Sequence, residues 1–483
     1  HLLGRRQRQM CIRDSNGTGF NTDAIIKKDM AGWTVANVGD IDGNGVNDLA
    51  VGALKDEDGA TKDVGSVRIL FLDNNLNVIG NSPTISETVM SGIGLPIIKK
   101  GFFSDGICGA GDVNGDGTPD IAVGASLEES AGFKKSGAVY VLFLDSTGTV
   151  TSGQRIANGI GGLPSGTLQK NVAFGTSVAC PGDLNGNGVP DLVVGAHKDS
   201  EVLKDIGAMY VLFLNNTGNV DSHQKISAGI GGLASVAYGK KDFIGWDVAS
   251  AGDVNGDGVG DIIMGAILRD GGPEKDAGSA TMIYLNADGT VAYHQEISDT
   301  EGGFTGALTK KDFFGASVGS MHVDMDNNCI DEIFVGASLD DSDGAFDKDI
   351  GAGWVLYLED VANLPRMAAS DDKLNVLPSS PVTNPAQSSG QETSIDLQLK
   401  GLDVTIFPNP TDGILHLDIV SSGSEDVKVE VATLLGQLVY TWENNIEGNV
   451  LHTVDMSQQA PGQYVMTMTS KDEKISKMFI LSK

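Results

Sequence analysis

Residues 111–125 read GDVNGDGTPDIAVGA, and this stretch decides the fold. It places Asp, Asn and Gly in a tight loop and follows them directly with a short apolar segment. The same arrangement occurs four more times, at residues 39–53, 182–196, 252–266 and 323–337. The first carboxylates of the five copies stand at positions 40, 112, 183, 253 and 324, so the spacing is 70 to 72 residues. A repeat this regular predicts an array of equivalent structural units.

Each loop carries side-chain oxygens at its positions 1, 3, 5 and 9, and four of the five have Gly at position 6, where a tight turn needs positive φ. A hard cation held by oxygens requires this pattern, and calcium is the ion expected. With position 7 included, the predicted metal residues are Asp40, Asp42, Asn44, Val46, Asp48, Asp112, Asn114, Asp116, Thr118, Asp120, Asp183, Asn185, Asn187, Val189, Asp191, Asp253, Asn255, Asp257, Val259, Asp261, Asp324, Asp326, Asn328, Ile330 and Glu332.

Two alternatives to this metal site are simpler motifs. Asp, Asn and Gly also form tight turns without any ion, but five copies with oxygens at four fixed positions favour metal binding. An EF-hand needs Glu at position 12, where all five loops have an apolar residue, so the EF-hand is excluded. The sequence predicts up to five calcium ions, one per loop. The fifth loop departs furthest from the pattern, with Asn327, Cys329 and Glu332 at positions 4, 6 and 9.

Each repeat is expected to form four strands. The first carries a Phe-Gly element, as in 174–178, 244–248 and 314–318, with weaker forms at 31–35 and 105–108. The second follows the metal loop and ends in Gly-Ala. The third is nearly continuously apolar, which predicts burial on both faces; it is expected at 65–72, 137–144, 207–214, 278–285 and 351–358. A turn such as 145–148 leads to a short fourth strand, such as 154–156.

These loops, with Phe-Gly before them and Gly-Ala after them, resemble the FG-GAP repeats of integrin α-subunit β-propellers and their bacterial relatives. The resemblance covers residues 16–360. It implies an all-β propeller with one four-stranded blade and one calcium ion per repeat of about 71 residues. Five blades are visible, and the fifth stops after its third strand. Propellers that close pair their terminal strands in one blade, so the missing strand is expected just before residue 16. Five blades could close in this way. Since propellers of the family that the repeats resemble usually have seven blades, the loss of one or two whole blades is the alternative.

The N-terminus does not match the rest of the chain. Residues 1–15 are basic, lack an initiator Met and have no signal-peptide apolar region, so we expect a non-native segment resembling translated adapter sequence. A disordered basic arm is the alternative. Residues 19–29 match 303–312, so the chain is expected to begin within a repeat and to be N-terminally truncated.

The C-terminal part has a different composition. Residues 361–400 are polar and rich in Pro and Ser, which predicts a flexible linker. Residues 401–483 contain short alternating strands, at 403–407, 414–419, 427–431 and 463–468, typical of a small Ig-like β-sandwich. Three features resemble the type A C-terminal sorting domain of the type IX secretion system: 407–413, the hairpin at 435–439, and 461–464 followed by 477–483. The resemblance implies contact with that machinery and export to the surface or medium of a Gram-negative bacterium. An ordinary Ig-like accessory module is the alternative.

The net charge of the chain excludes some classes of binding partner. The formal net charge of −31 argues against nucleic acid and anionic membranes, and no apolar run is long enough to span a bilayer. The four cysteines, Cys11, Cys108, Cys180 and Cys329, show no CxxC and no regular framework, which predicts no structural disulfide set. Lys pairs recur at 27–28, 99–100, 240–241 and 310–311. They either solvate a loop or line one rim of the propeller and meet an acidic glycan.

No catalytic constellation is evident. The GxSxG pattern at 315–319 lies in a first-strand position, where no nucleophile elbow is expected, and no HxxxH or HExxH pair occurs. We therefore expect a calcium-binding adhesion or recognition module for extracellular protein or polysaccharide. The alternative is the accessory propeller of a secreted polysaccharide- or protein-degrading enzyme, or such an enzyme itself, since a catalytic domain upstream of residue 16 is compatible with the sequence.

Overall fold

The structure is a computed structural model that describes residues 29–58, 62–233, 238–270, 274–321, 323–325, 330–340, 351–358, 393–399, 402–409, 414–433, 438–457, 459, 462–470 and 473–481. The predicted non-native segment, the start of the first repeat and most of the predicted linker lie outside these residues. The described chain is almost entirely β-structure, as predicted, with one short helix, α2 (Glu87–Gly92). It divides into two compact units, residues 1–382 and 383–483.

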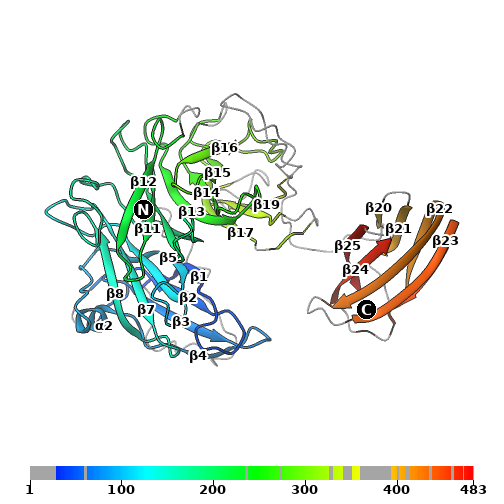
Figure 1. The fold of residues 1–483 in the computed structure, drawn as a ribbon. Helices are drawn as coiled ribbons and strands as arrows, with labels where there is room; N and C mark the ends of the chain where they lie inside the picture. The colour runs from blue at the N-terminus through cyan, green and yellow to red at the C-terminus, as the bar shows by residue number, and fades with distance from the viewer. Residues whose placement is uncertain are drawn as a thin grey trace. The chain divides into compact units, whose positions relative to one another are not determined.

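The first unit is a series of antiparallel sheets whose strands follow one another in chain order (Figure 1). The four-stranded sheets are formed by β1 (Ala31–Asn37), β2 (Leu49–Ala53), β3 (Ser66–Leu72) and β4 (Val78–Asn81); β5 (Phe103–Gly111), β6 (Asp120–Ala125), β7 (Ala138–Leu144) and β8 (Val150–Ala157); β9 (Val178–Gly182), β10 (Asp191–Ala196), β11 (Ala208–Leu214) and β12 (Val220–Ile226); and β13 (Ile244–Gly252), β14 (Asp261–Ala266), β15 (Ser279–Leu285) and β16 (Val291–Ile297). Within the described residues the fifth sheet has three strands, β17 (Phe314–Ser320), β18 (Ile333–Ala337) and β19 (Ala352–Leu356).

The sheets confirm the predicted four-strand repeat and its order. The third strands begin one residue later than predicted, and the fourth strands are longer, because the polar residues before the predicted segment also pair. In β8, for example, Val150 already pairs with Leu144 of β7 across the predicted turn. Such sheets are what a propeller blade requires.

The core lies between consecutive sheets. Four buried apolar clusters each combine side chains of two neighbouring sheets, as with Ile69 of the first and Tyr140 of the second. First strands of neighbouring sheets also contact one another, β1 with β5, β5 with β9, β9 with β13 and β13 with β17. Residues of the third strands β7, β11 and β15 are buried along their whole length. The apolar third strand is therefore buried on both faces, because neighbouring blades cover it, as predicted.

The glycines of the repeat have a steric cause. A Cβ added at Gly124, in the Gly-Ala end of β6, would lie 2.0 Å from the carbonyl oxygen of Gly175 in the Phe-Gly element of the next blade. The same collision recurs at Gly195 with Gly245 at 2.3 Å, and at Gly265 with Gly315 at 2.0 Å. The backbones of neighbouring blades meet at this point. Glycine in the Gly-Ala and Phe-Gly elements therefore permits the close packing of adjacent blades.

The Phe-Gly element of the second blade is not at 105–108, where the sequence analysis placed it. Phe103 pairs with Ala125 just as Phe314 pairs with Ala337, so Phe103 and Ser104 are the true counterparts. Ser104 takes the glycine's place with a φ of +76°. The element was misplaced because its glycine is the recognisable residue, and here a serine adopts the left-handed backbone conformation in place of glycine.

The second unit is a strongly bent sheet. Its strands are β20 (Thr393–Leu399), β21 (Leu402–Asn409), β22 (Ile414–Thr433), β23 (Leu438–Asp455), β24 (Gly462–Ser470) and β25 (Glu473–Leu481). β22 pairs with β23 along its length, and its other edge pairs first with β21 and then with β24. Leu417 from the first half of β22, Val429 from its second half and Met466 of β24 share one buried core. Two strands predicted separately, at 414–419 and 427–431, are thus one long strand with a register shift after Ser421.

The predicted linker extended too far toward the C-terminus. Residues 393–399 form β20, which pairs with β21. Ile395, Leu397 and Leu399 alternate with polar residues, and this period of two is the strand signal that the polar composition of the segment obscured.

Candidate metal centre

The predicted metal loops all join the first strand of a sheet to its second. They span 38–48, 112–119, 183–190 and 253–260 in the four-stranded sheets, and 321–332 in the fifth. In an antiparallel meander, every connection from strand one to strand two lies at the same end of its sheet. The repeat therefore puts the loops on one side of the blades, together with the turns from strand three to strand four.

The first loop brings its three carboxylates together. Oxygens of Asp40, Asp42 and Asp48 all lie within 4.8 Å of one another. The backbone N–H groups of Asn44 and Gly45 donate to the two oxygens of Asp40, at 3.0 and 2.8 Å. The Asn44 side-chain amide donates to the Leu72 carbonyl at 2.9 Å, which ties the loop to the end of β3.

The other complete loops fold in the same way. In the second loop, Asp112 accepts from Gly115 and Asp116 with one oxygen and from Gly117 with the other, at 2.8 to 3.0 Å. Asp183 and Asp253 hold their loops through equivalent bonds. The position 5 side chains accept from the backbone N–H at position 7: Asn44 from Val46, Asp116 from Thr118, Asn187 from Val189 and Asp257 from Val259, at 2.7 to 2.9 Å. The position 3 oxygens of Asn114, Asn185 and Asn255 accept from position 5.

Position 9 anchors each loop to its blade. Asp120 accepts from the N–H of Val113 at 3.0 Å with one oxygen and from the N–H of Leu144, at the end of β7, at 3.1 Å with the other. Asp48, Asp191 and Asp261 make the corresponding pairs of bonds at 2.9 to 3.2 Å. All four side chains are fully buried. The Asp120 oxygen that bonds Val113 also accepts from the N–H of Asn114 at 3.4 Å, whereas the oxygen that bonds Leu144 keeps a second lone pair and so has capacity for a cation.

Burial and crowding raise the pKa values of these anchors. Desolvation is the main cause and raises the pKa of Asp120 and Asp191 to about 6 and that of Asp261 to about 7; the pKa of Asp48 also rises. Backbone hydrogen bonds oppose the increase, while the charges of Asp42, Asp116, Asp183 and Asp257 add to it. The effect of the neighbouring carboxylates shows that acidic groups crowd each loop, and an oxygen-liganded cation fits this donor set.

The fifth loop is only partly described. Asp326 and Asn328 lie outside the described residues. Glu332, which is fully buried, accepts from the N–H of Met325 at 2.7 Å, the bond that Asp makes at position 9 in the other loops. Asp324 and Ile330 stand at positions 1 and 7 of this loop. The longer Glu side chain thus keeps the anchor although the glycine at position 6 is replaced.

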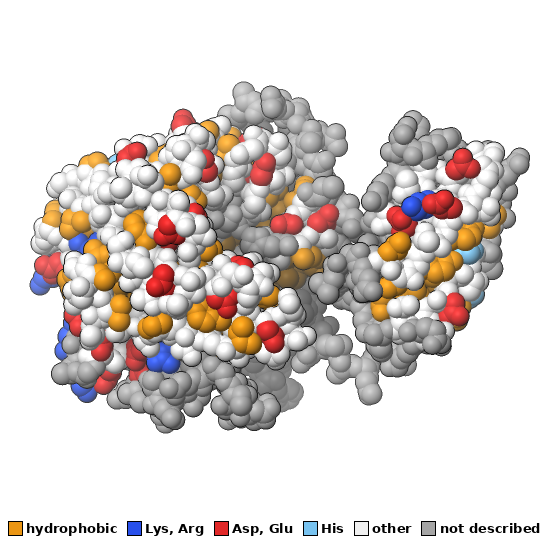
Figure 2. Space-filling view, turned by 60° about the horizontal axis from the view of Figure 1, so that its bottom comes forward, with side chains coloured by type: hydrophobic (Ala, Val, Ile, Leu, Met, Phe, Trp, Pro, Cys, Tyr) orange, Lys and Arg blue, Asp and Glu red, His pale blue; other side chains and the backbone are white. Residues whose placement is uncertain are grey.

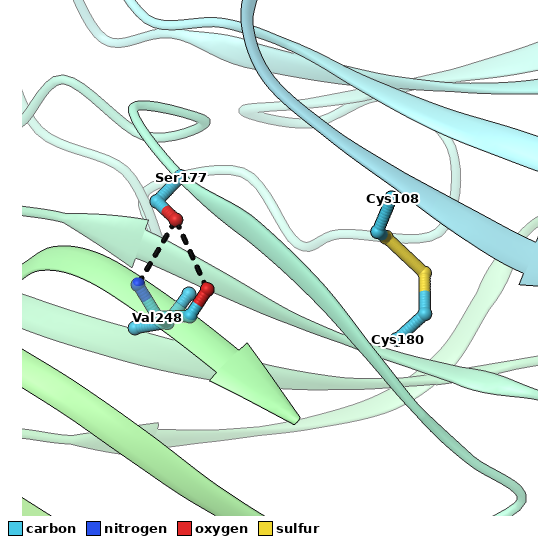
Figure 3. The surroundings of a disulfide bond; sticks show 4 residues. All are labelled: Cys108, Ser177, Cys180 and Val248. Atoms are coloured by element: carbon cyan, nitrogen blue, oxygen red, sulfur yellow. Dashed lines mark hydrogen bonds between the residues drawn. A yellow bond between two sulfur atoms is a disulfide. The ribbon is translucent and has the colours of Figure 1, made fainter. Parts of the chain in front are cut away.

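The first unit contains a disulfide. Cys108 of β5 and Cys180 of β9 are bonded, with their Cα atoms 6.0 Å apart (Figure 3). The prediction of no structural disulfide was therefore wrong for this pair. The signal was present, because the two cysteines are 72 residues apart, close to one repeat. Two residues one repeat apart lie on first strands of adjacent blades, and those strands touch.

Polar bonds continue the connection to the next blade. The hydroxyl of Ser177, the residue just before β9, accepts from the Val248 N–H of β13 at 3.0 Å and lies 3.2 Å from the Val248 carbonyl oxygen (Figure 3). It also donates to Asp247 at 2.7 Å, and the second oxygen of Asp247 accepts from the Val318 N–H of β17 at 2.9 Å. Successive first strands are thus linked by side chains as well as by apolar packing.

Sequence comparison identifies two known modules. Residues 107–142 match the FG-GAP repeat, and residues 405–482 match the secretion system C-terminal sorting domain. The chain is 33% identical over 162 residues to bovine (Bos taurus) phosphatidylinositol-glycan-specific phospholipase D, covering 33% of this chain and 18% of the relative. It is 30% identical over 161 residues to integrin alpha-5 of Xenopus laevis, covering 32% and 14%, and 28% identical over 242 residues to integrin alpha pat-2 of Caenorhabditis briggsae, covering 49% and 18%.

The chain thus spans less than a fifth of the length of these three relatives. A DUF3244 family protein from Bacteroides vulgatus with an immunoglobulin-like β-sandwich fold aligns over 19% of this chain and 100% of its own, at 19% identity and a TM-score of 0.15. No helix within the described residues is long and apolar enough to cross a membrane. The chain combines an integrin-like FG-GAP repeat region with a type IX secretion system C-terminal sorting domain, and it is a secreted or cell-surface protein.

Proposed function

We propose that this chain is a calcium-binding propeller module that recognises an extracellular protein or polysaccharide after export through its C-terminal sorting domain. The observation that carries the calcium part is the first loop, where three carboxylates meet within 4.8 Å. The same side-chain-to-backbone bonds shape the second, third and fourth loops, so the proposal extends to them, with the fifth loop as a further site. The integrin alpha relatives support the recognition role.

Calcium has a structural role in this proposal. Position 1, 3 and 5 oxygens, the position 7 carbonyl and the position 9 carboxylate would hold the ion. The ion would offset the repulsion that crowds each loop. Because the position 9 carboxylate also bonds the end of the third strand, an ordered loop stiffens the whole blade. Extracellular sites of this kind have Kd values of about 0.1–1 mM, so about 5 mM calcium would stabilise the fold by roughly 1–2 kcal/mol per site.

The test compares two variants of the second blade. Asp112→Ala removes the position 1 ligand, and Asp145→Ala removes a carboxylate in the nearby turn that is not a predicted ligand. We expect calcium to raise the Tm of the wild type and of Asp145→Ala, and to raise that of Asp112→Ala by less. Equilibrium dialysis should find one fewer bound calcium in Asp112→Ala alone. A wild-type Tm that does not change between calcium and a chelator at low ionic strength would contradict the proposal.

A second candidate is an accessory propeller of a secreted enzyme. The similarity to phosphatidylinositol-glycan-specific phospholipase D favours it, since that relative is named for a catalytic activity. Sequencing the gene upstream of the codon for Asn16 separates the two. A signal peptide followed by a strand or further blades supports a free-standing recognition module, whereas a catalytic domain makes these blades its accessory.

A further inference from the structure

A cavity of about 590 Å³ lies between the first two blades, on the side opposite the metal loops. Five lysines line it. Lys55 follows β2, Lys99 and Lys100 precede β5, and Lys134 and Lys135 lie between β6 and β7. Connections from strand two to strand three, and from one blade to the next, all lie at this end of the sheets. The volume is in the range of small-ligand sites.

The lysines of this cavity outnumber its carboxylates, which are those of Asp63 and Glu129. Among the described residues, none of the five forms an ion pair. Partly buried cations elsewhere on the same side are paired: Arg155 with Glu128 at 2.5 Å, Lys225 with Asp199 at 2.8 Å and Arg269 with Glu296 at 3.1 Å. In a chain of net charge −31, five lysines lining one cavity form a local excess of positive charge. Their mutual repulsion would be relieved by an anionic ligand.

The backbone holds these lysines in place. The N–H of Lys100 donates to the Asp63 carbonyl at 3.0 Å, which joins the loop before β5 to the loop after β2. Lys100, Phe102 and Lys135 all have φ between +55° and +61°, in the left-handed region. Non-glycine residues adopt this backbone only where the surrounding structure requires it. The cavity wall is therefore shaped by the fold and does not depend on free side chains alone.

The remaining walls indicate what kind of anion fits. Asp63 and Glu129 place carboxylates beside the lysines, and Phe102 and Leu127 provide apolar surface. A long polyphosphate would meet repulsion from those carboxylates and from the overall charge. A sugar with an acidic group matches all three kinds of lining residue. The lysines would bind its acidic group, the carboxylates would accept hydrogen bonds from its hydroxyl groups, and its ring would lie on the apolar surface.

We propose that this cavity binds an acidic sugar unit, carboxylated or sulfated, of an extracellular polysaccharide. The proposal rests on the recognition role proposed above and names the class of ligand. It selects one of the two roles open for the recurring Lys pairs, and only for the pair at 99–100.

The test uses the full chain and defined oligosaccharides. The probes are tetragalacturonate, its methyl-esterified neutral form, and a sulfated galactan tetrasaccharide, measured by calorimetry in calcium-containing buffer. The variant is Lys99→Gln with Lys134→Gln. The control is Lys240→Gln with Lys275→Gln, which are the corresponding positions of the fourth blade and do not line this cavity. Tm values establish that both double variants fold.

We expect an acidic tetrasaccharide to bind the wild type and the control equally, and to bind Lys99→Gln with Lys134→Gln about tenfold more weakly, as loss of two charge-assisted contacts implies. The neutral form should bind at least about tenfold more weakly than its acid form. The carboxylated and sulfated probes identify which acid is preferred. Equal weakening in both double variants, absence of binding by both acidic probes, or equal binding of a polyglutamate peptide overturns the proposal. A calcium-dependent Tm in the same samples would show that the proposed calcium module stands even if this inference fails.

Discussion

Asp105 shows how one buried carboxylate connects two blades. This half-buried residue of β5 accepts from the Trp33 indole of β1 at 2.9 Å and also from the Ser126 hydroxyl. Burial raises its pKa to about 6, against the lowering effect of both bonds. An acid with a raised pKa in the folded state keeps its proton while the unfolded chain has released it. Its contribution to stability is therefore largest at low pH and is lost as pH rises through about 6.

The substitution Asp105→Asn should remove this pH dependence. The Ser126 hydroxyl can reverse to accept from the new amide, so the network survives. We expect the difference in Tm between the variant and the wild type to increase from pH 5 to pH 7. The corresponding difference in unfolding free energy should change by at most about 1.4 kcal/mol per pH unit. Asp73→Asn is the control: hydrogen bonds from Asn77 lower the pKa of Asp73, so it stays ionised throughout this range. A Tm difference for Asp105→Asn that is flat with pH would contradict the assigned pKa.

At the level of single residues, the sequence predicted more of the loops than of the blades. Short-range spacing singled out positions 1, 3, 5 and 9, and side chains at these positions make the hydrogen bonds that shape the loops, while their role as metal ligands stays a prediction. The double role of Asp120 was not identified, since its bond to Leu144 crosses 24 residues and only the register of β6 and β7 creates it. Ser104 was missed for a similar reason, because a backbone conformation and not a residue type defines its place.

At the scale of elements, the contact between β10 and β13 offers a strict steric test. A Cβ at Gly195 would lie 2.3 Å from the Gly245 carbonyl oxygen, and backbone cannot move aside as a side chain can. Gly195→Ala should therefore separate the third and fourth blades and cost roughly 3 kcal/mol. Gly319→Ala, on the first strand β17, meets no atom within 4 Å and serves as the control. Thermal unfolding at constant calcium compares them, and equal Tm values would refute the close approach.

The disulfide between β5 and β9 should stabilise the second and third blades together. It closes a segment of 72 residues, and loss of such a link typically costs about 2–4 kcal/mol. We expect a reductant to lower the Tm of the wild type, and the double variant Cys108→Ser with Cys180→Ser to show the lower Tm without responding to the reductant. If the reductant shifts both proteins equally, its effect does not arise from this bond.

Elements were predicted well where periodicity is local and poorly where it is not. Apolar third strands and Asx-rich turns follow from neighbouring residues, and their positions were correct within a few residues. The disulfide, the pairing of β20 with β21 and the continuity of β22 depend on which segments meet in space. Equivalent positions of adjacent repeats become neighbours in a stacked array. Because Cys108 and Cys180 are about one repeat apart in the sequence, their pairing could have been predicted from this rule.

At the scale of the whole molecule, charge is distributed unevenly between the two ends of the blades. The connections at 38–48, 73–77, 112–119, 145–149, 183–190, 215–219, 253–260 and 286–290 contain no Lys or Arg. Apart from Lys225, the described lysines of the first unit lie in the connections at the other end. Figure 2 shows one side of the first unit. Asp and Glu side chains are scattered over this side, whereas its Lys and Arg side chains lie near the outer edge of the unit in this view. This difference follows from the repeat, because each copy adds acidic residues without lysine at one end and a mixture of lysines and acidic residues at the other.

This arrangement predicts how salt and calcium act together. Without calcium, the acidic end repels itself, and NaCl should raise the Tm by screening that repulsion. With about 5 mM calcium present, bound ions already offset the loop charges, so the same NaCl series should raise the Tm much less. The variant Asp112→Asn with Asp116→Asn lowers the charge of one loop, and in chelator its Tm should depend less on NaCl than that of the wild type. Scanning fluorimetry from 20 to about 500 mM NaCl, a range that shortens the Debye length severalfold, measures all three slopes. Identical slopes with calcium and with chelator would mean that the loop carboxylates are not the charges that calcium neutralises, whereas a slope reduced by calcium and by the double variant would assign the repulsion to the loops themselves.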